Sequence, residues 1–264
     1  MAAPCLDVRG VAMRYGEGAA AVNALERIDL AVEPREFVTI VGPSGCGKST
    51  LLYLIGGFLA PSGGEILLHG SPIRAPGPDR GIVFQRYSLF PWLTVAGNIG
   101  FGLEEQGMPR AERERVIAEH VRLVHLEGFE RRYPRELSGG MQQRVAIAQT
   151  LACGPEILLM DEPFGALDAQ TRRILQDELR RIWRRDTKTV LFVTHDVEEA
   201  VALGTRIVVM AARPGRIKEI VTRNFEVDEG GEFEADPAFV AMKLHVWRSV
   251  KEEVDAARAA GIAP

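Results

Sequence analysis

The sequence predicts an α/β fold in which a mainly parallel sheet is covered by helices on both faces. Two observations carry this prediction: short aliphatic segments alternate with helical patterns, and a glycine-rich loop at 42–47 joins a strand to a helix. A long helical stretch at 94–152 interrupts the alternation and indicates an inserted helical subdomain. The 264 residues, of which 46% are hydrophobic and 26% charged, are typical of a globular protein with one or two domains.

The segments that predict this fold follow one another in a regular order. Strands are expected where aliphatic residues cluster or alternate, at 6–11, 25–32, 37–41, 65–69, 81–84, 157–160, 190–193 and 206–210. Helices are expected at 51–59, at 112–126, along a face marked by Ile174, Leu175, Leu179 and Ile182, and at 237–260. The proline-rich segment 70–79 predicts a surface loop, and the segment 226–236, with six acids and no base, predicts a solvated acidic loop.

Charge and cysteine usage exclude several classes of protein. The 32 basic and 36 acidic residues leave a formal charge of −4, so no overall electrostatic case exists for binding nucleic acid. The scattered Cys5, Cys46 and Cys153 fit neither a disulfide framework nor a CxxC metal site, and their odd number suits a reducing compartment. No secretory signal is visible, and the most apolar stretch, 51–60, is shorter than the ~20 residues that span a bilayer. We therefore expect a cytosolic chain.

The strongest single motif is a phosphate-binding loop. It reads Gly42-Pro43-Ser44-Gly45-Cys46-Gly47-Lys48-Ser49-Thr50. The motif follows an apolar strand and opens a helix, which is the context that a P-loop requires. Its glycines let backbone N–H groups converge on phosphate oxygens, Lys48 reaches the β- and γ-phosphates, and the Ser49 hydroxyl ligates Mg²⁺. The motif therefore predicts a site for a nucleoside triphosphate and Mg²⁺.

An apolar strand at 157–160 ends in two carboxylates, Asp161 and Glu162. They are expected at the carboxyl edge of the sheet, where ligands bind in open α/β folds. Asp161 can hold Mg²⁺ directly or through water, and Glu162 can orient and deprotonate an attacking water. Together with the P-loop, this pair predicts a nucleoside triphosphatase but leaves a kinase, a GTPase, a helicase and a transporter motor open. The lack of an Asn-Lys-x-Asp motif disfavours the GTPase.

A second anion-binding helix end is expected at Ser138-Gly139-Gly140. Ser138 is a good N-cap, and the two glycines expose the first backbone N–H groups of the helix that follows. One γ-phosphate does not need two such anion-binding helix ends from one chain unless the two ends bind different nucleotide molecules. The segment from Leu137 to Arg144 therefore separates this sequence from a generic nucleoside triphosphatase.

With these motifs in this order, residues 5–225 resemble the ATP-binding subunit of ATP-binding-cassette (ABC) transporters, and the segment from Leu137 to Arg144 resembles that family's signature. The resemblance implies a P-loop NTPase core of the ABC ATPase type, with an N-terminal antiparallel β subdomain and an inserted helical subdomain at about 90–152. Residues 1–230 would form the nucleotide-binding domain, and residues 231–264 a C-terminal acidic loop with a helical extension.

The resemblance also implies roles for single residues. Tyr15 would stack on adenine, although it could instead pack on the core. Gln85 would sense Mg²⁺ and the attacking water, His195 would contact the γ-phosphate, and the Ala166-Leu167-Asp168 loop would cross a dimer interface. The expected catalytic residues are then Glu162, His195 and Gln85, the metal ligands Ser49, Gln85 and Asp161, and the nucleotide-binding residues Tyr15, the nine P-loop residues, Ser138, Gly139, Gly140 and Asp168.

Two residues depart from the family pattern, and one cysteine carries an expectation of its own. Met141 replaces the usual glutamine of the signature, and Gly165 replaces the usual serine before the Ala166-Leu167-Asp168 loop. Neither change removes a group that hydrolysis needs. Cys46 lies inside the P-loop beside a helix N-terminus, which is expected to lower the pKa of its thiol. We therefore expect bulky thiol reagents to inhibit the chain and ATP to protect it.

In the family's mechanism two copies sandwich each ATP between Lys48 of one copy and Ser138 of the other. The resemblance therefore implies a homodimer that drives separate transmembrane permease subunits, with an extracytoplasmic substrate-binding protein contributing indirectly and no nucleic acid involved. The permease contact is expected between Tyr87 and Trp92, because 89–93 is an apolar, aromatic run; the alternative is that these side chains belong to the core. The expected location is the cytoplasmic face of the inner membrane, held there through the permease.

The transported solute is the least determined part of the prediction. The Pro-Trp pair after Gln85, followed by Asn98-Ile99, resembles importers of nitrate, sulfonates and taurine, but polyamine importers share much of this pattern. One competing function is a soluble cassette ATPase of DNA repair or translation, although the chain has neither a long coiled-coil insertion nor a second cassette. Another is a small-molecule kinase, which leaves Ser138 and His195 unexplained.

Overall fold

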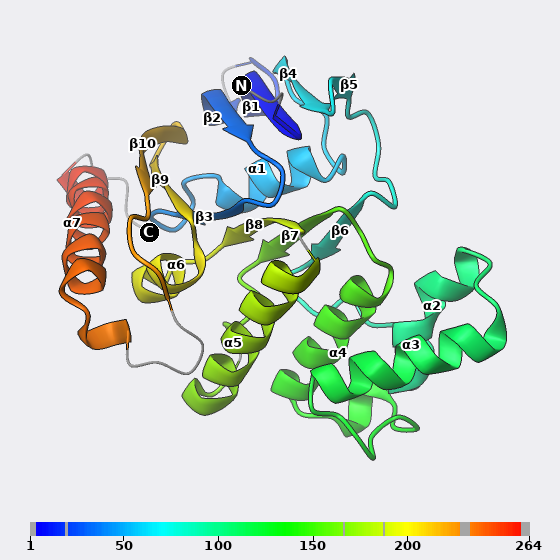
Figure 1. Ribbon diagram of the computed structural model, residues 1–264. Coiled ribbons are helices and arrows are strands. Elements are labelled where there is room, and N and C mark those ends of the chain that lie inside the picture. Colours follow the sequence, from blue (N-terminus) through cyan, green and yellow to red (C-terminus); the bar gives the residue numbers. More distant parts are fainter. Residues whose placement is uncertain (1–3, 19–20, 166, 187, 228–232, 260–264) are drawn as a thin grey trace. The chain divides into compact units, whose positions relative to one another are not determined.

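The computed structural model of the protein describes residues 4–18, 21–165, 167–186, 188–227 and 233–259 (Figure 1). The chain divides into two compact units. Met1–Gly77 and Trp183–Pro264 form one, called here the P-loop unit, and Pro78–Ile182 form the other, called here the helical unit. Across the described ranges, no helix combines the length and the apolar character needed to cross a membrane.

An antiparallel sheet begins the P-loop unit. Its strand order is β2 (Val22–Val32), β1 (Leu6–Tyr15), β4 (Gly63–Leu68) and β5 (Ser71–Pro72). Leu6 pairs with Val32 on one side and with Leu68 on the other, so β1 is an inner strand of the sheet. Buried and exposed side chains nearly alternate along β1, as expected when one face of a sheet packs on a core. The antiparallel β subdomain that the resemblance implied is present.

The other strands of the P-loop unit are mostly parallel and buried. β3 (Phe37–Val41) pairs in parallel with both β8 (Thr189–Val193) and β9 (Arg206–Ala211), and every residue of β3 and β8 is buried. β10 (Arg216–Thr222) joins β9 antiparallel and was not predicted. Charged residues at 216, 218 and 219 hide its aliphatic positions, so only pairing with β9 reveals it as a strand.

Among its described residues, the P-loop unit also contains three helices and a short 3-10 turn. They are α1 (Lys48–Ile55), α6 (Val197–Leu203), η3 (Phe233–Ala235) and α7 (Pro237–Ala259). α1 begins within the P-loop motif, as expected, but it ends about one turn before the predicted residue 59, because Gly56 caps the helix and Gly57 turns away with φ of +77°. α7 runs beside α6 and β9 and buries Phe239 and Val246 in a common apolar core (Figure 1). The helix expected at 237–260 is therefore confirmed for the described residues, whereas 228–232 of the acidic loop lie outside them.

The helical unit is built on two parallel strands, β6 (Arg80–Val83) and β7 (Ile157–Asp161). Between them the chain forms α2 (Val95–Glu105), α3 (Arg110–Leu123), η2 (Pro134–Glu136) and α4 (Gly139–Ala152), and α5 (Ala169–Asp186) follows β7. α2, α3 and α4 enclose an apolar core (Figure 1). The predicted face of α5 is correct for Leu175, Leu179 and Ile182, which are buried, but wrong for Ile174, which is 44% exposed. Successive helical residues turn by ~100°, so Ile174 lies off the seam that its neighbour Leu175 occupies.

Candidate functional site

The predicted site residues are shared between the two units. The P-loop unit holds Tyr15, the nine residues from Gly42 to Thr50, and His195. The helical unit holds Gln85, Ser138, Gly139, Gly140, Asp161, Glu162 and Asp168.

The P-loop joins β3 to α1, as the sequence predicts, and two of its glycines are required by close contacts. Gly47 is the N-cap of α1 with φ of +95°, and a Cβ there would lie 2.5 Å from the Cδ2 atom of Leu25. A Cβ on Gly42 would lie 2.6 Å from the carbonyl oxygen of Met210. Both positions therefore exclude any larger residue. Ser44 and Gly45 are exposed, while Pro43, Ser49 and Thr50 are partly buried.

The Lys48 side chain folds back across the loop that precedes it. Only 6% of Lys48 is exposed, and its Nζ donates hydrogen bonds to the carbonyl oxygens of Gly42 (2.9 Å) and Pro43 (3.0 Å). The buried ammonium group is thus satisfied by main-chain acceptors from the same loop. A phosphate placed over the loop would meet this cation together with the N–H groups at the start of α1.

The structure corrects the expectation for Cys46. Its side chain is fully buried, and burial raises the pKa of the thiol even though the Lys48 ammonium, 3.9 Å from Sγ, opposes this. Desolvation of the thiolate therefore outweighs both the helix N-terminus and the neighbouring cation. Cys46 is predicted to be an unreactive thiol, and the inhibition by bulky thiol reagents proposed from the sequence loses its basis.

Tyr15 and His195 are accessible in the P-loop unit. Tyr15 is the last residue of β1 and is 41% exposed, so the alternative in which its ring packs in the core is wrong. His195 follows β8 by two residues and is also exposed. Both side chains are therefore open to a ligand, and the burial of Thr194 just before His195 fixes the end of the strand.

In the helical unit, strand β7 ends in the two predicted carboxylates. Asp161 is the last residue of the strand and is 1% exposed, and Glu162 follows it. The Nε2 atom of Gln85, just after β6, donates a hydrogen bond to Oε2 of Glu162 at 3.2 Å. Because β6 and β7 are parallel neighbours, their carboxyl ends bring these two side chains together although 77 positions separate them.

Glu162 has an unusual backbone conformation and a neighbour that the sequence did not predict. Its φ is +47°, in the left-handed region that non-glycine residues rarely adopt. The Nε2 atom of Gln143, on α4, lies 3.5 Å from the carbonyl oxygen of Glu162. A glutamine inside a helix carries no sequence signal that points to a strand end, so only the fold identifies this contact.

The predicted second helix end is present at the start of α4. Ser138 is its N-cap, and its Oγ accepts a hydrogen bond from the backbone N–H of Met141 at 3.3 Å. A Cβ on Gly139 would lie 2.9 Å from the hydroxyl oxygen of Tyr87, so this aromatic ring packs directly on the first glycine. The capping prediction is confirmed, and Tyr87 joins the helix end to the segment that follows Gln85.

Asp168 has a local structural task in addition to its expected place in an interface loop. Its Oδ1 accepts a hydrogen bond from the backbone N–H of Thr171 at 2.9 Å, which caps the start of α5. Backbone donation from Thr171 lowers the pKa of the Asp168 carboxyl. Ala166 of the same loop lies outside the described residues, while Leu167 is buried and Gly165 exposed.

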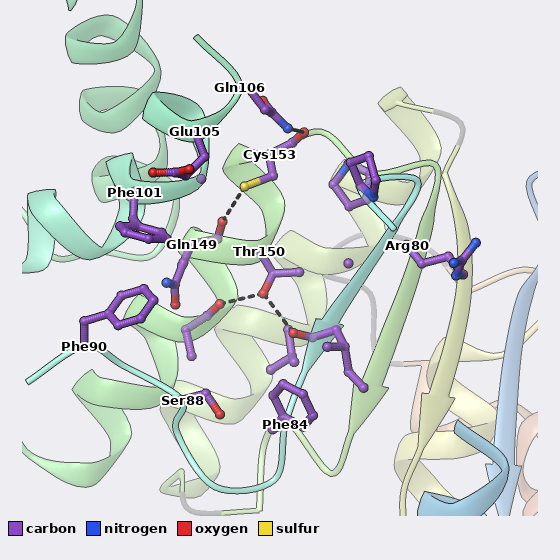
Figure 2. A pocket seen from close by; sticks show the side chains of 17 residues that line it. Arg80, Phe84, Ser88, Phe90, Phe101, Glu105, Gln106, Gln149, Thr150 and Cys153 are labelled. Atoms are coloured by element: carbon purple, nitrogen blue, oxygen red, sulfur yellow. Dashed lines mark hydrogen bonds between the residues drawn. The ribbon is translucent and has the colours of Figure 1, made fainter. Parts of the chain in front are cut away.

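A groove of about 590 Å³ opens on the helical unit between β6, α2 and α4 (Figure 2). Phe84, Phe90 and Phe101 supply aromatic walls, and the rings of Phe90 and Phe101 are 4.4 Å apart between centroids. Figure 2 shows Glu105 and Gln106 at one end of the groove beside Cys153, whose carbonyl oxygen accepts a hydrogen bond from Gln106. The lining of the groove is therefore mainly apolar, with polar side chains such as Ser88, Gln149 and Thr150 between the aromatic ones.

One buried side chain holds the loop beside this groove. Asn98 is inaccessible to solvent; its Oδ1 accepts from the Phe90 N–H at 2.8 Å, and its Nδ2 lies within 3.0–3.1 Å of the carbonyl oxygens of Phe90, Leu93 and Thr94. This loop is thus fixed in shape, and it presents Trp92, which is 70% exposed. The alternative that assigns the aromatic run to the core is wrong for Trp92.

Each unit, taken by itself, holds donor groups of the kind that a nucleoside triphosphate with Mg²⁺ requires. Glycines that allow close approach, a helix N-terminus and a lysine ammonium suit polyphosphate oxygens. The Ser49 hydroxyl of the P-loop unit is a hard oxygen ligand of the kind that Mg²⁺ takes alongside phosphate oxygens and water, and so are the Gln85 amide oxygen and the Asp161 carboxylate of the helical unit.

The profile of a protein family described as ABC transporter matches residues 25–165, which contain the P-loop, the Ser138–Gly140 helix end and both carboxylates. The chain belongs to the ABC transporter family. It is therefore an ATP-binding, ATP-hydrolysing transporter subunit, as the motifs predicted.

Relatives and solved structures agree with this family membership. An uncharacterized ABC transporter ATP-binding protein of Methanocaldococcus jannaschii is 59% identical over 78% of this chain and 77% of its own length. The taurine import ATP-binding protein TauB of Pseudomonas putida is 46% identical over 91% of this chain and 93% of its own. A dimeric, post-hydrolysis structure of an ATP-binding cassette with ADP and Pi is 35% identical, with a TM-score of 0.77 over 83% of this chain and all of the other.

Proposed function

We propose that the chain is the ATP-hydrolysing subunit of an ABC importer that takes up a small anion, of which taurine or another sulfonate is the first candidate and nitrate the second. The hydrogen bond between Gln85 and Glu162 carries the hydrolytic part of this proposal, because it aligns an amide with a carboxylate at the end of a strand. The substrate class is supported by similarity to TauB of Pseudomonas putida. A polyamine importer is the alternative of the same kind.

The proposed chemistry assigns a task to each residue of the site. The N–H groups of the P-loop and the Lys48 ammonium bind the β- and γ-phosphates, and Tyr15 stacks on the base. Ser49, Gln85 and Asp161 would hold Mg²⁺, which when bound neutralises charge on the phosphate oxygens. The Glu162 carboxylate accepts a proton from the attacking water while the Gln85 amide orients that water, and the His195 ring contacts the γ-phosphate.

The proposed active form is a homodimer with two ATP molecules between the copies. Each copy contributes one P-loop and one helix end at Ser138, Gly139 and Gly140, so each ATP meets the P-loop of one copy and the helix end of the other. Asp168 would lie at the boundary between copies. The similar cassette that was solved as a dimer with ADP and Pi supports this arrangement.

The proposed partner of the groove on the helical unit is a helix of a separate permease subunit. An apolar groove with aromatic walls suits an amphipathic helix. Trp92 is exposed, and its ring centroid lies 5.5 Å from that of Phe90, which lines the groove. The chain would then sit on the cytoplasmic face of the inner membrane, held by the permease, with an extracytoplasmic binding protein selecting the solute and no nucleic acid involved. Residues 1–230, with the helical subdomain at 90–152, would act as the nucleotide-binding domain and 231–264 as an extension.

Growth of a strain that lacks this chain tests the proposed function. Taurine, an alkanesulfonate or sulfate serves as the only sulfur source, and a separate arm supplies nitrate as the only nitrogen source. Loss of growth on sulfonates alone, restored by the wild-type chain but not by Glu162→Gln, is the expected result. Failure on nitrate alone would move the assignment to nitrate uptake, and growth in every arm would contradict both. Recovery of the chain in a soluble complex without membranes would favour a non-transport ATPase.

A further inference from the structure

The backbone of Glu162 is held in a conformation that its side chain does not favour. Its φ of +47° is sterically costly for a residue with a Cβ, so neighbouring groups must maintain it. The carbonyl oxygen accepts a turn hydrogen bond from the Gly165 N–H at 3.2 Å and has the Gln143 Nε2 atom 3.5 Å away. The direction of the Glu162 carboxylate depends on this backbone, because the side chain starts from its Cα.

Packing alone does not explain why a glutamine is buried at position 143. Its side chain is 1% exposed, and its Oε1 atom is buried with no hydrogen-bond partner among the described residues. A buried amide with an unused acceptor is less stable than an apolar side chain of the same length. A carbonyl oxygen can only accept, so the amide presents its nitrogen to Glu162. Within the described part of the chain, the contact with Glu162 is thus the one polar interaction of this side chain.

We propose that Gln143 is a positioning residue for ATP hydrolysis. Its amide holds the left-handed backbone of Glu162 and so keeps the carboxylate directed at Gln85 and the attacking water. The inference rests on the proposed role of Glu162 as general base. It adds a link within one chain, because Gln143 lies one turn after Gly139 on α4 and ties the helix that begins at Ser138 to the carboxylate.

The segment after β6 makes a second connection between Glu162 and the start of α4. Gln85 donates to the Glu162 carboxylate, and Tyr87, two residues later, packs on Gly139. Gln143 therefore connects α4 directly to Glu162.

A double-mutant cycle tests this proposal. Gln143→Met keeps length and helix propensity but removes the amide, and Gln176→Met, at a second buried glutamine of the helical unit, is the matched control. We expect Gln143→Met to lower kcat for ATP about tenfold with KM changed less than about twofold, while the control changes neither beyond about twofold. In the Glu162→Gln background, single-turnover hydrolysis should fall less than about twofold when Gln143→Met is added.

The cycle also separates this proposal from the one on which it rests. An equal loss from Gln143→Met in both backgrounds would overturn the positioning role, because the residue would then act independently of the Glu162 carboxylate. A rise in KM at unchanged kcat would overturn it too. Near wild-type hydrolysis by Glu162→Gln alone would reject Glu162 as general base, and the positioning role with it. Thermal unfolding of each variant identifies losses that come from instability.

Discussion

The Nε2 atom of Gln85 donates a hydrogen bond to Oε2 of Glu162 at 3.2 Å, although 77 positions separate the two residues. The contact exists because β6 and β7 are parallel neighbours that end at the same edge. It pairs a neutral amide, which can turn toward a cation or a water, with a carboxylate that can accept a proton. The groove lined by Phe84 and Phe90 begins on the same segment, so a partner seated there would be close to Gln85 in the chain.

Replacing the carboxylate at this contact should nearly abolish turnover. We expect Glu162→Gln to slow ATP hydrolysis about a hundredfold or more, because an amide cannot accept the proton of the attacking water. Binding of ATP should survive, since the P-loop is untouched. Light scattering at saturating ATP should then detect a trapped dimer, and a variant that stays monomeric would contradict the sandwich of two copies.

Cys46 should be slow to react with thiol reagents. The thiolate is the reactive form, and burial raises the pKa of this thiol, so little thiolate is present near neutral pH. We expect Cys46 in the folded chain to be labelled by a maleimide at least about tenfold more slowly than in the urea-unfolded chain, with a rate that rises as pH increases. Mass spectrometry of the Cys46 peptide measures this rate. Equally fast labelling of the folded and the unfolded chain would contradict this and would support the sequence-based expectation that the helix N-terminus makes Cys46 reactive.

Removing the cap of α5 should lower thermal stability in a pH-dependent way. Asp168→Ala deletes the acceptor for the Thr171 N–H, and loss of such a cap is expected to lower Tm by about 2–4 °C at neutral pH. Because this hydrogen bond lowers the pKa of Asp168 in the folded chain, its stabilisation is present above the carboxyl's ordinary pKa and is lost as pH falls through the lowered value. Calorimetry of both chains at several pH values checks this. A Tm difference that grows on acidification would contradict it.

The loop beside the groove offers a pair of variants that separate stability from docking. Asn98→Ala removes the side-chain partner of the Phe90 N–H and of the Leu93 carbonyl, while the carbonyl oxygens of Phe90 and Thr94 keep backbone donors. The free energy of unfolding should therefore fall by about 2–4 kcal/mol in urea titrations. Trp92→Ala, at an exposed position, should change it by less than about 0.5 kcal/mol.

The same pair tests the proposed permease contact. Copurification with the permease subunits should weaken about tenfold for Trp92→Ala, as for an aromatic anchor of an interface. Retention of full permease binding by Trp92→Ala would place the contact elsewhere on the chain.

The sequence by itself determined the parts of this protein whose chemistry is local. The P-loop, the cap at Ser138 and the strand that ends in Asp161 depend on residues that are neighbours in the chain, so their spacing alone predicts their geometry. The strands β3, β8 and β9 could also be predicted from the sequence, because buried parallel strands are continuous aliphatic runs.

Only the tertiary structure decided the features that depend on distant neighbours. β10 is a strand because β9 is beside it, and its own charged residues conceal this. The pKa of the Cys46 thiol is set by burial rather than by the nearby helix end, and this desolvation is a property of the packed fold. The same holds for the approach of Gln143 to Glu162: nineteen positions apart in the sequence, they meet because α4 packs beside the end of β7, and no local pattern encodes which side chains such packing brings together.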